Sequence, residues 1–279
     1  MTCVAGIDSG SWNTKAVVID AEARILGSAV VRSGADLEGA ARAAYIDALR
    51  AARIDASEVS AVWATGFGRG SVTFANGSRT ELDCHGRGAA FFVPGPMVVI
   101  DIGGEDAKVI RIDAKGQRLS HRMNRKCAAG TGSFLDEIAL RLGVAIGDLD
   151  VLASGSTQPL ELSSFCTVFA GTELLALIRS GKRPSDLAMA AYRSLVKRVM
   201  AMDVLQGHVV ATGGVVAYHP NVVRLLGEAL GTEVTVPPHA QEMGAFGAAL
   251  AARDGAVSVG QAGLHADAAP TAVSPTHGR

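Results

Sequence analysis

Ile7-Asp8-Ser9-Gly10 and Ile100-Asp101-Ile102-Gly103-Gly104 are two versions of one pattern, in which an apolar strand reaches an aspartate and a glycine turn follows. Apolar residues resume after each turn, at residues 14–20 and 108–112, so each pair of apolar runs predicts a β-hairpin. Because the hairpin occurs twice, the sequence predicts an α/β fold with two related lobes.

In each predicted turn, a carboxylate lies beside the backbone amides of glycines, which have no side chain to cover them. Such amides can donate hydrogen bonds to phosphate oxygens. The carboxylate can hold Mg²⁺ through water, because magnesium gives up its water shell reluctantly. Two hairpins that face each other would therefore clamp a chain of phosphates from both sides. A single Asp-x-Gly turn is usually a plain turn, so the prediction depends on finding both.

A third glycine turn, Ala211-Thr212-Gly213-Gly214-Val215, follows a short apolar strand. Two adjacent glycines at a strand end let a flat base or a ribose lie against the backbone. In this order, the three turns together predict a nucleotide site far more specifically than any one of them does.

The rest of the chain alternates between strand-like and helix-like patterns. Further strands are predicted at residues 24–32, 59–65, 209–211 and 233–236, and helices at residues 37–52, 166–180, 184–202, 221–230 and 241–253 and from about residue 133. We expect a first lobe over residues 1–115 and a second over 116–253, whose last helix returns to the first lobe. Residues 254–279 are rich in Ala, Gly, Ser, Pro and Thr, and are expected to be a disordered tail.

Composition excludes several functional classes. The 279 residues are 48% hydrophobic and carry a net charge of -1, so there is no basic surplus of the kind that nucleic-acid binding requires. No apolar run approaches the roughly 18 residues that cross a bilayer. The first residues lack the basic segment of a signal peptide. We therefore expect a cytoplasmic protein with neither a nucleic-acid nor a membrane partner.

The chain has four cysteines and no Cys-x-x-Cys pair, so the sequence does not support a common zinc or thioredoxin-like site. Cys3 and Cys84 are expected to be small buried side chains. Cys127 and Cys166 are candidate metal ligands. A cubane iron–sulfur cluster takes four thiolates, so two ligands per chain would require two chains.

Several motifs resemble those of the actin/Hsp70/hexokinase superfamily. Residues 6–20, 101–108 and 211–218 resemble its phosphate-1, phosphate-2 and adenosine motifs. Within it, Asn124-Arg125-Lys126-Cys127-Ala128-Ala129-Gly130-Thr131-Gly132-Ser133 and Phe165-Cys166-Thr167-Val168-Phe169-Ala170 closely resemble the signature of one branch. That branch comprises the ATPase activators of 2-hydroxyacyl-CoA dehydratases and the ATPase subunits of benzoyl-CoA reductase. The resemblance covers roughly residues 3–252.

The resemblance implies a two-lobed ATPase with ATP or ADP in the cleft between duplicated ribonuclease-H-like lobes. Asp8 and Asp101 would be carboxylates on the Mg²⁺ side and, with Glu105, the catalytic residues. Glu105 stands where the family usually has Gln; we expect it to position the attacking water, and the change leaves its effect on hydrolysis open. The expected nucleotide contacts are Gly10, Ser11, Thr14, Lys15, Gly103, Gly104, Gly213, Gly214 and Gln241.

The resemblance also implies one [4Fe-4S] cluster per dimer, ligated by Cys127 and Cys166 of each subunit. The dimer would be a homodimer or would pair the chain with a paralogous subunit. A ferredoxin or flavodoxin would reduce the cluster, and the acceptor would be an iron–sulfur CoA-ester dehydratase or reductase. Both cysteines are predicted to lie near helix starts, where the positive helix end favours negative charge. Nucleotide-driven tilting of these helices would then change how strongly the cluster reduces its acceptor.

Three other functions remain open: an ATPase subunit of benzoyl-CoA reductase, a small-molecule kinase without a cluster, and a chaperone-like ATPase. The last is disfavoured because the chain lacks a peptide-binding domain. Some polar residues have simpler interpretations. His85 and His239 are expected to be hydrogen-bonded loop histidines, and Asp136 and Glu137 to be acids in the first turn of a helix. The acyl-CoA substrate would be bound by the partner and is not encoded here.

Overall fold

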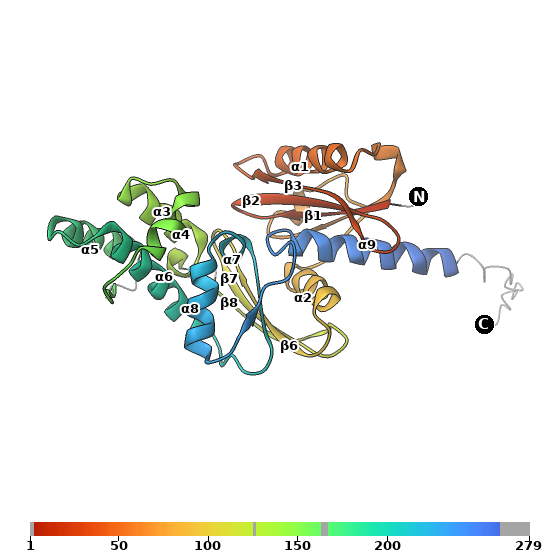
Figure 1. Ribbon diagram of the computed structural model, residues 1–279. Helices are drawn as coiled ribbons and strands as arrows, with labels where there is room; N and C mark the ends of the chain where they lie inside the picture. Colours follow the sequence, from red (N-terminus) through yellow and green to blue (C-terminus); the bar gives the residue numbers. More distant parts are fainter. Residues whose placement is uncertain (1–2, 125–126, 163–166, 263–279) are drawn as a thin grey trace, which may run out of the picture.

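A computed structural model describes residues 3–124, 127–162 and 167–262. These residues form two five-stranded sheets, with two helices packed between the sheets and a group of helices at the far end of the second sheet (Figure 1). Both predicted hairpins are confirmed, because residues 4–9 pair antiparallel with residues 14–19, and residues 97–102 pair antiparallel with residues 107–112.

The first sheet has the strand order β3-β2-β1-β4-β5. Strands β1, β2 and β3 are antiparallel, whereas β4 runs parallel to β1, and β5 runs parallel to β4. Helix α1 covers one face of this sheet, and its alanine-rich side packs against the strand residues. The elements are β1 (Cys3–Ser9), β2 (Asn13–Ile19), β3 (Ile25–Arg32), α1 (Leu37–Ala52), β4 (Val59–Thr65) and β5 (Gly77–Ser78), with short 3-10 helices at Ala56–Glu58 and Arg69–Ser71.

The second sheet repeats this plan in the order β10-β9-β6-β7-β8. Its strands are β6 (Met97–Ile102), β7 (Ala107–Ile112), β8 (Arg118–Asn124), β9 (Val209–Thr212) and β10 (Val234–Thr235). In this sheet β6 pairs with β7 and with β9, and β7 pairs with β8, so the second hairpin belongs to the second sheet. Strand β8 is largely exposed and polar, so its sequence has no buried alternation that predicts a strand.

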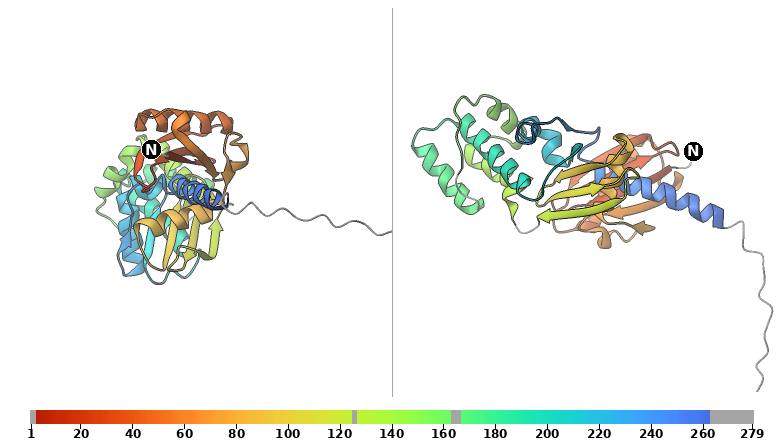
Figure 2. Two further views of the ribbon diagram at one scale, coloured as in Figure 1. Left: turned by 90° about the vertical axis from the view of Figure 1, so that its right-hand side faces the viewer. Right: turned by 90° about the horizontal axis from the view of Figure 1, so that it is seen from below.

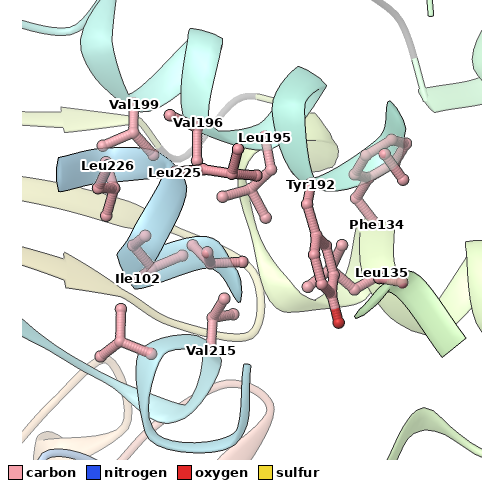
Figure 3. Packing of buried hydrophobic residues seen from close by; sticks show 14 of the residues in the cluster. Ile102, Phe134, Leu135, Tyr192, Leu195, Val196, Val199, Val215, Leu225 and Leu226 are labelled. Carbon is pink, nitrogen blue, oxygen red and sulfur yellow. The ribbon is translucent and has the colours of Figure 1, made fainter. Parts of the chain in front are cut away.

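Helices of the second lobe pack around a core that includes Tyr192 of α6 (Figure 3). Phe134 and Leu135 of α3 meet Leu195 and neighbouring side chains of α6, which in turn pack on α8 and the second sheet. The helices are α3 (Gly132–Leu142), α4 (Leu149–Ser154), α5 (Thr167–Arg179), α6 (Pro184–Met200), α7 (Gly214–Tyr218) and α8 (Pro220–Leu230), with 3-10 helices at Ala128–Gly130 and Ile146–Asp148. None of the helices in the described part of the chain could span a lipid bilayer.

Two helices, α2 (Glu81–Phe92) and α9 (Met243–Ala262), pack against each other between the sheets. Helix α9 lies on the first sheet and α2 on the second (Figure 1; Figure 2 gives two more views). Their backbones approach so closely that a Cβ atom at Gly247 would lie 1.9 Å from the carbonyl oxygen of Cys84. This contact between α2 and α9 therefore depends on a residue without a side chain.

Helix α9 continues to Ala262, beyond residue 254, where the sequence predicts an irregular tail. The carboxylate of Asp254 pairs with Arg87 of α2, and Gly255 lies against the ring of Trp63. These two contacts lie at the point where the apolar periodicity ends, and the helix continues past it.

Gly247→Ala is expected to destabilise the protein by about 1–3 kcal/mol or more, because the added methyl forces α2 and α9 apart. The urea midpoint would measure this change. Gly70→Ala is the matched control, because nothing lies within 4 Å of its Cβ position. Equal midpoints for the two variants would contradict the close contact between α2 and α9.

Candidate functional site

One pocket collects residues from the two hairpin turns and from the third glycine turn. The ends of β6 and β9 lie side by side in the second sheet, and together with the end of β1 in the first sheet they supply residues to its wall. Eleven of the twelve residues expected to contact nucleotide, magnesium or the attacking water line this pocket: Asp8, Gly10, Ser11, Lys15, Asp101, Gly103, Gly104, Glu105, Gly213, Gly214 and Gln241. The twelfth, Thr14, is fully buried behind the turn, with its hydroxyl 2.9 Å from that of Ser33.

Each hairpin carries an aspartate–lysine pair in the same register. Asp8 is opposite Lys15 and Asp101 is opposite Lys108 in their antiparallel ladders. In both pairs the lysine Nζ lies 3.1 Å from the aspartate Oδ2. The duplication therefore extends from the backbone to a pair of opposite charges on each side of the pocket.

The two pairs differ in their surroundings. Lys108 is buried, and its Nζ also lies 2.7 Å from Asp106 and 3.7 Å from Glu81 of α2. Asp101 accepts a hydrogen bond from Thr212 at 3.2 Å and lies 3.5 Å from His85 Nδ1. The second pair is thus embedded in a network that joins β6, β7, β9 and α2.

Burial and charge oppose each other in this network. Burial alone raises the pKa of Asp101, but His85 and Lys108 lower it more, so the carboxyl group stays ionised well below its usual pKa range. Burial alone lowers the pKa of Lys108, but Asp101 and Asp106 raise it more, above its ordinary value. Both groups therefore remain charged around neutral pH.

The glycines leave space that a side chain would fill. Gly213 has a φ of 97°, and a Cβ atom there would lie 2.4 Å from the carbonyl oxygen of Ile102. A Cβ atom at Gly104 would lie 2.4 Å from atoms of Trp12. Bare backbone, two carboxylates and lysine ammonium groups in one pocket fit the phosphates of a nucleotide with Mg²⁺, whose preferred ligands are oxygen atoms.

A second pocket, of about 430 Å³, adjoins the first. The two share Trp12, Asn13, Gly103, Gly104, Gly214 and Gln241 in their walls. Tyr218 donates a hydrogen bond from its hydroxyl group to Gln241 at 2.9 Å on one side, and Arg32 stacks over Trp12 at 4.5 Å on the other. Aromatic and apolar walls beside a phosphate pocket suit a base and its ribose.

Several wall residues were not predicted from the sequence. Asp136 of α3 faces the second pocket, and the prediction that Asp136 and Glu137 are first-turn acids is wrong, because α3 begins at Gly132 and its first turn contains no acid. His85 lies on helix α2 rather than in a loop, is buried, and lines the first pocket. Lys108 could have been found, because Asp101 and Lys108 repeat the spacing of Asp8 and Lys15. The wall also includes Trp12, Phe67, Glu81, Asp106, Ile146, Gly147, Tyr218 and His219, which come together only in the folded chain.

Cys127 has an exposed side chain and directly precedes the 3-10 helix Ala128–Gly130. The predicted second ligand, Cys166, lies outside the described residues. Cys3 and Cys84 are buried, as the sequence predicts, and burial raises the pKa of Cys84 to about 12. Within the described residues no three His, Cys, Asp or Glu side chains are grouped to hold a metal ion.

Two related sheets, with an aspartate and a glycine turn on each side of a shared pocket, define a nucleotide-binding ATPase of the actin, Hsp70 and sugar-kinase fold. The chain belongs to the BadF/BadG/BcrA/BcrD ATPase family, which matches it over residues 5–252.

Relatives and solved structures agree with this assignment. The chain is 39% identical over 249 residues to the (R)-2-hydroxyglutaryl-CoA dehydratase activating ATPase of Acidaminococcus fermentans, covering 88% of this chain and 95% of that protein. It is 30% identical over 263 residues to a benzoyl-CoA reductase subunit of Thauera aromatica, covering 90% and 93%. The activator of the 2-hydroxyisocaproyl-CoA dehydratase from Clostridium difficile, solved with bound ADPNP, superposes with a TM-score of 0.89 at 32% identity, covering 98% of this chain and 100% of that one.

Lys108→Met is expected to destabilise the protein by about 3–5 kcal/mol at pH 7, because it leaves the buried Asp101 without its lysine. The folded pKa of Asp101 is lowered, so its contribution to the free energy of unfolding is fully present above its unfolded pKa of about 3.9 and is lost as the pH falls toward the folded pKa. The folded pKa of Lys108 is raised, so its contribution to the free energy of unfolding is fully present below its unfolded pKa of about 10.4.

Urea unfolding of the wild type and Lys108→Met at several pH values would measure this difference. The difference should be constant between about pH 6 and 8 and should narrow below about pH 4, where Asp101 becomes protonated in the unfolded chain. Lys15→Met, in the more exposed pair, should cost less. A difference that grows as the pH falls would count against the assigned network.

Proposed function

We propose that this ATPase uses ATP to drive low-potential electron transfer to an iron–sulfur CoA-ester dehydratase, through a [4Fe-4S] cluster that two copies of the chain share. The observation that carries the proposal is that one chain combines the nucleotide pocket with an exposed cysteine, Cys127, on its second lobe. The dehydratase-activating relatives supply the class of acceptor.

In the first pocket, the backbone turns at Gly10 and at Gly103-Gly104 lie against the phosphate chain; the amides of Gly10 and Gly103 donate to the carbonyl oxygens of Asp8 and Asp106 and so hold these turns in shape. Asp8 and Asp101 are the carboxylates that would hold Mg²⁺ through water, and the ion would neutralise charge that develops on the phosphates. Lys15 is the more accessible of the two lysines and takes the role of a phosphate contact. Lys108, surrounded by Asp101, Asp106 and Glu81, keeps Asp101 charged and oriented.

In the second pocket, the base and ribose lie between the α3 side and the α7 side. Gly213 and Gly214 bring the backbone against the nucleoside, and Tyr218 fixes the amide of Gln241. Glu105 is exposed at the mouth of the first pocket, where it accepts a hydrogen bond from the attacking water.

Cys127, together with Cys166, would hold the cluster, which supplies one-electron transfer when bound. The exposed position of Cys127 fits a cluster at the surface of a subunit, within reach of a second copy. Helices α3 and α5 also carry exposed apolar side chains, Leu140 at 75% and Phe169 at 67% exposure, and such surfaces favour contact with another protein. A homodimer with a ferredoxin or flavodoxin as donor completes the proposal.

A second candidate is an ATPase subunit of benzoyl-CoA reductase, which the relative in Thauera aromatica favours. In that case the cluster would be shared with a different chain. Copurification with the other chains of a reductase, rather than activation of a separate dehydratase, would distinguish this role from the first.

Anaerobically purified protein is expected to contain about four irons and four sulfides per pair of chains. Cys127→Ala and Cys166→Ala should each lose this iron, because a cluster needs all of its thiolates. Iron and sulfide analysis with visible absorption would measure it, and Cys3→Ala is the matched control that should keep the cluster. A colourless, iron-free wild type that phosphorylates a small molecule would support a kinase instead.

Glu105→Ala is expected to lower the ATP hydrolysis rate by about 100-fold or more, the usual minimum for losing a group that acts on the attacking water. Glu105→Gln should retain most of the rate, because an amide oxygen still accepts a hydrogen bond from water. Steady-state phosphate release would measure both. A Gln variant as slow as the Ala variant would assign Glu105 to proton abstraction rather than positioning.

A further inference from the structure

The turn that lines the phosphate pocket is hydrogen-bonded to the segment that follows Cys127. The amide of Gly132 donates to the carbonyl oxygen of Gly103 at 2.9 Å, and the amide of Ser133 donates to that of Gly104 at 2.7 Å. Gly103 and Gly104 line both pockets. The first turn of α3 is therefore attached to the backbone that the phosphates would touch.

We name residues 127–133 the coupling segment. Further hydrogen bonds hold the backbone of this segment between Cys127 and the first turn of α3. The hydroxyl of Thr131 donates to the carbonyl oxygen of Ala128 at 2.6 Å, and its amide donates to the same oxygen at 3.0 Å. Thr131 is fully buried. The one-turn helix after Cys127 is thus closed by two hydrogen bonds from a single residue.

The other end of the coupling segment is held by Asn124, at the end of β8. Its amide nitrogen donates to the carbonyl oxygen of Cys127 at 2.9 Å, and its amide oxygen accepts from the Cys127 amide at 3.2 Å. Asn124 is opposite Ala107 in the β7–β8 ladder, and Ala107 directly follows the phosphate turn. The backbone of Cys127 is therefore tied to the phosphate turn by two routes.

We infer that the coupling segment is a rigid connection through which the nucleotide state of the Gly103-Gly104 turn sets the position of Cys127, with Thr131 and Gly132 as its positioning residues. The inference rests on the proposed function, in which this turn binds phosphate and Cys127 is a cluster ligand. A γ-phosphate that draws the turn toward itself shifts the start of α3, and the closed turn at Thr131 carries the shift to Cys127.

Gly132 gives a direct way to disturb the connection. A Cβ atom there would lie 3.3 Å from the Gly103 carbonyl oxygen and from the Val215 side chain, so a methyl group requires the turn or Val215 to shift by a few tenths of an ångström. Gly130, in the same segment, is the matched control, because its Cβ atom would lie 3.4 Å or more from its neighbours. Thr131→Val removes the hydroxyl group at nearly constant shape, and Thr131→Ser restores it.

The test measures the alkylation rate of Cys127 in the iron-free full-length protein, read by mass spectrometry of its peptide. Rates are compared with Mg-ADP and with a non-hydrolysable ATP analogue, each at saturating concentration. In the wild type the two rates should differ by about fivefold or more, the lower end of usual coupling between sites. Gly132→Ala and Thr131→Val should bring the ratio near one, while Gly130→Ala and Thr131→Ser should keep it.

Nucleotide affinity, measured by titration of each variant, separates the possible failures. If the wild type binds both nucleotides and shows equal rates, or if Gly132→Ala and Thr131→Val keep the wild-type ratio, the inference is wrong. Iron content of the anaerobic protein tests the cluster separately, so the proposed function can survive that result. If the wild type binds neither nucleotide, the proposed function and this inference both fail. If Gly132→Ala does not fold, Thr131→Val and Thr131→Ser decide the matter.

Discussion

The buried ion pair between Asp101 and Lys108 is the constraint around which the site is organised. A buried charge is costly unless it is paired and hydrogen-bonded, so Thr212 of β9, His85 of α2 and Asp106 of the turn all converge on this pair. Their convergence fixes the second hairpin against β9 and against α2. The phosphate turn, the adenosine turn and one of the two helices between the sheets therefore share a single electrostatic centre.

Close backbone packing supplies the second constraint. Gly247 of α9 lies directly against the backbone of Cys84 in α2, Gly88 of α2 makes room for the backbone and side chain of Met243, and Gly6 lies against the α9 backbone where it crosses β1. Large interlocking side chains would resist sliding at such a contact, whereas small residues offer little resistance. The two lobes are thus held together by the charged network around Asp101 and Lys108 at the pocket and by the close glycine contacts of α2 and α9 behind it.

Much of this architecture could be predicted from the sequence, because the hairpin pattern is local. The apolar runs, Asp8, Asp101 and the glycine turns are readable one segment at a time, and the fold follows from their repetition. Strand β8 could not be predicted in this way, because it is held by pairing with β7 and not by burial. The pocket walls at Trp12, Asp136 and Tyr218 depend on contacts between distant segments. A hairpin pattern also does not reveal which sheet the hairpin joins, so the membership of β6 and β7 in the second sheet required the structure.

The shape of the second lobe adds a mechanical consequence. Helix α5 lies at the opposite end of the molecule from α9, with the helices of the second lobe extending outward between them (Figures 1 and 2). For a rotation about the α2–α9 contact, the displacement of any point grows in proportion to its distance from the axis. The second lobe therefore acts as a lever arm, and a rotation that barely disturbs the pocket moves its outer helices the farthest.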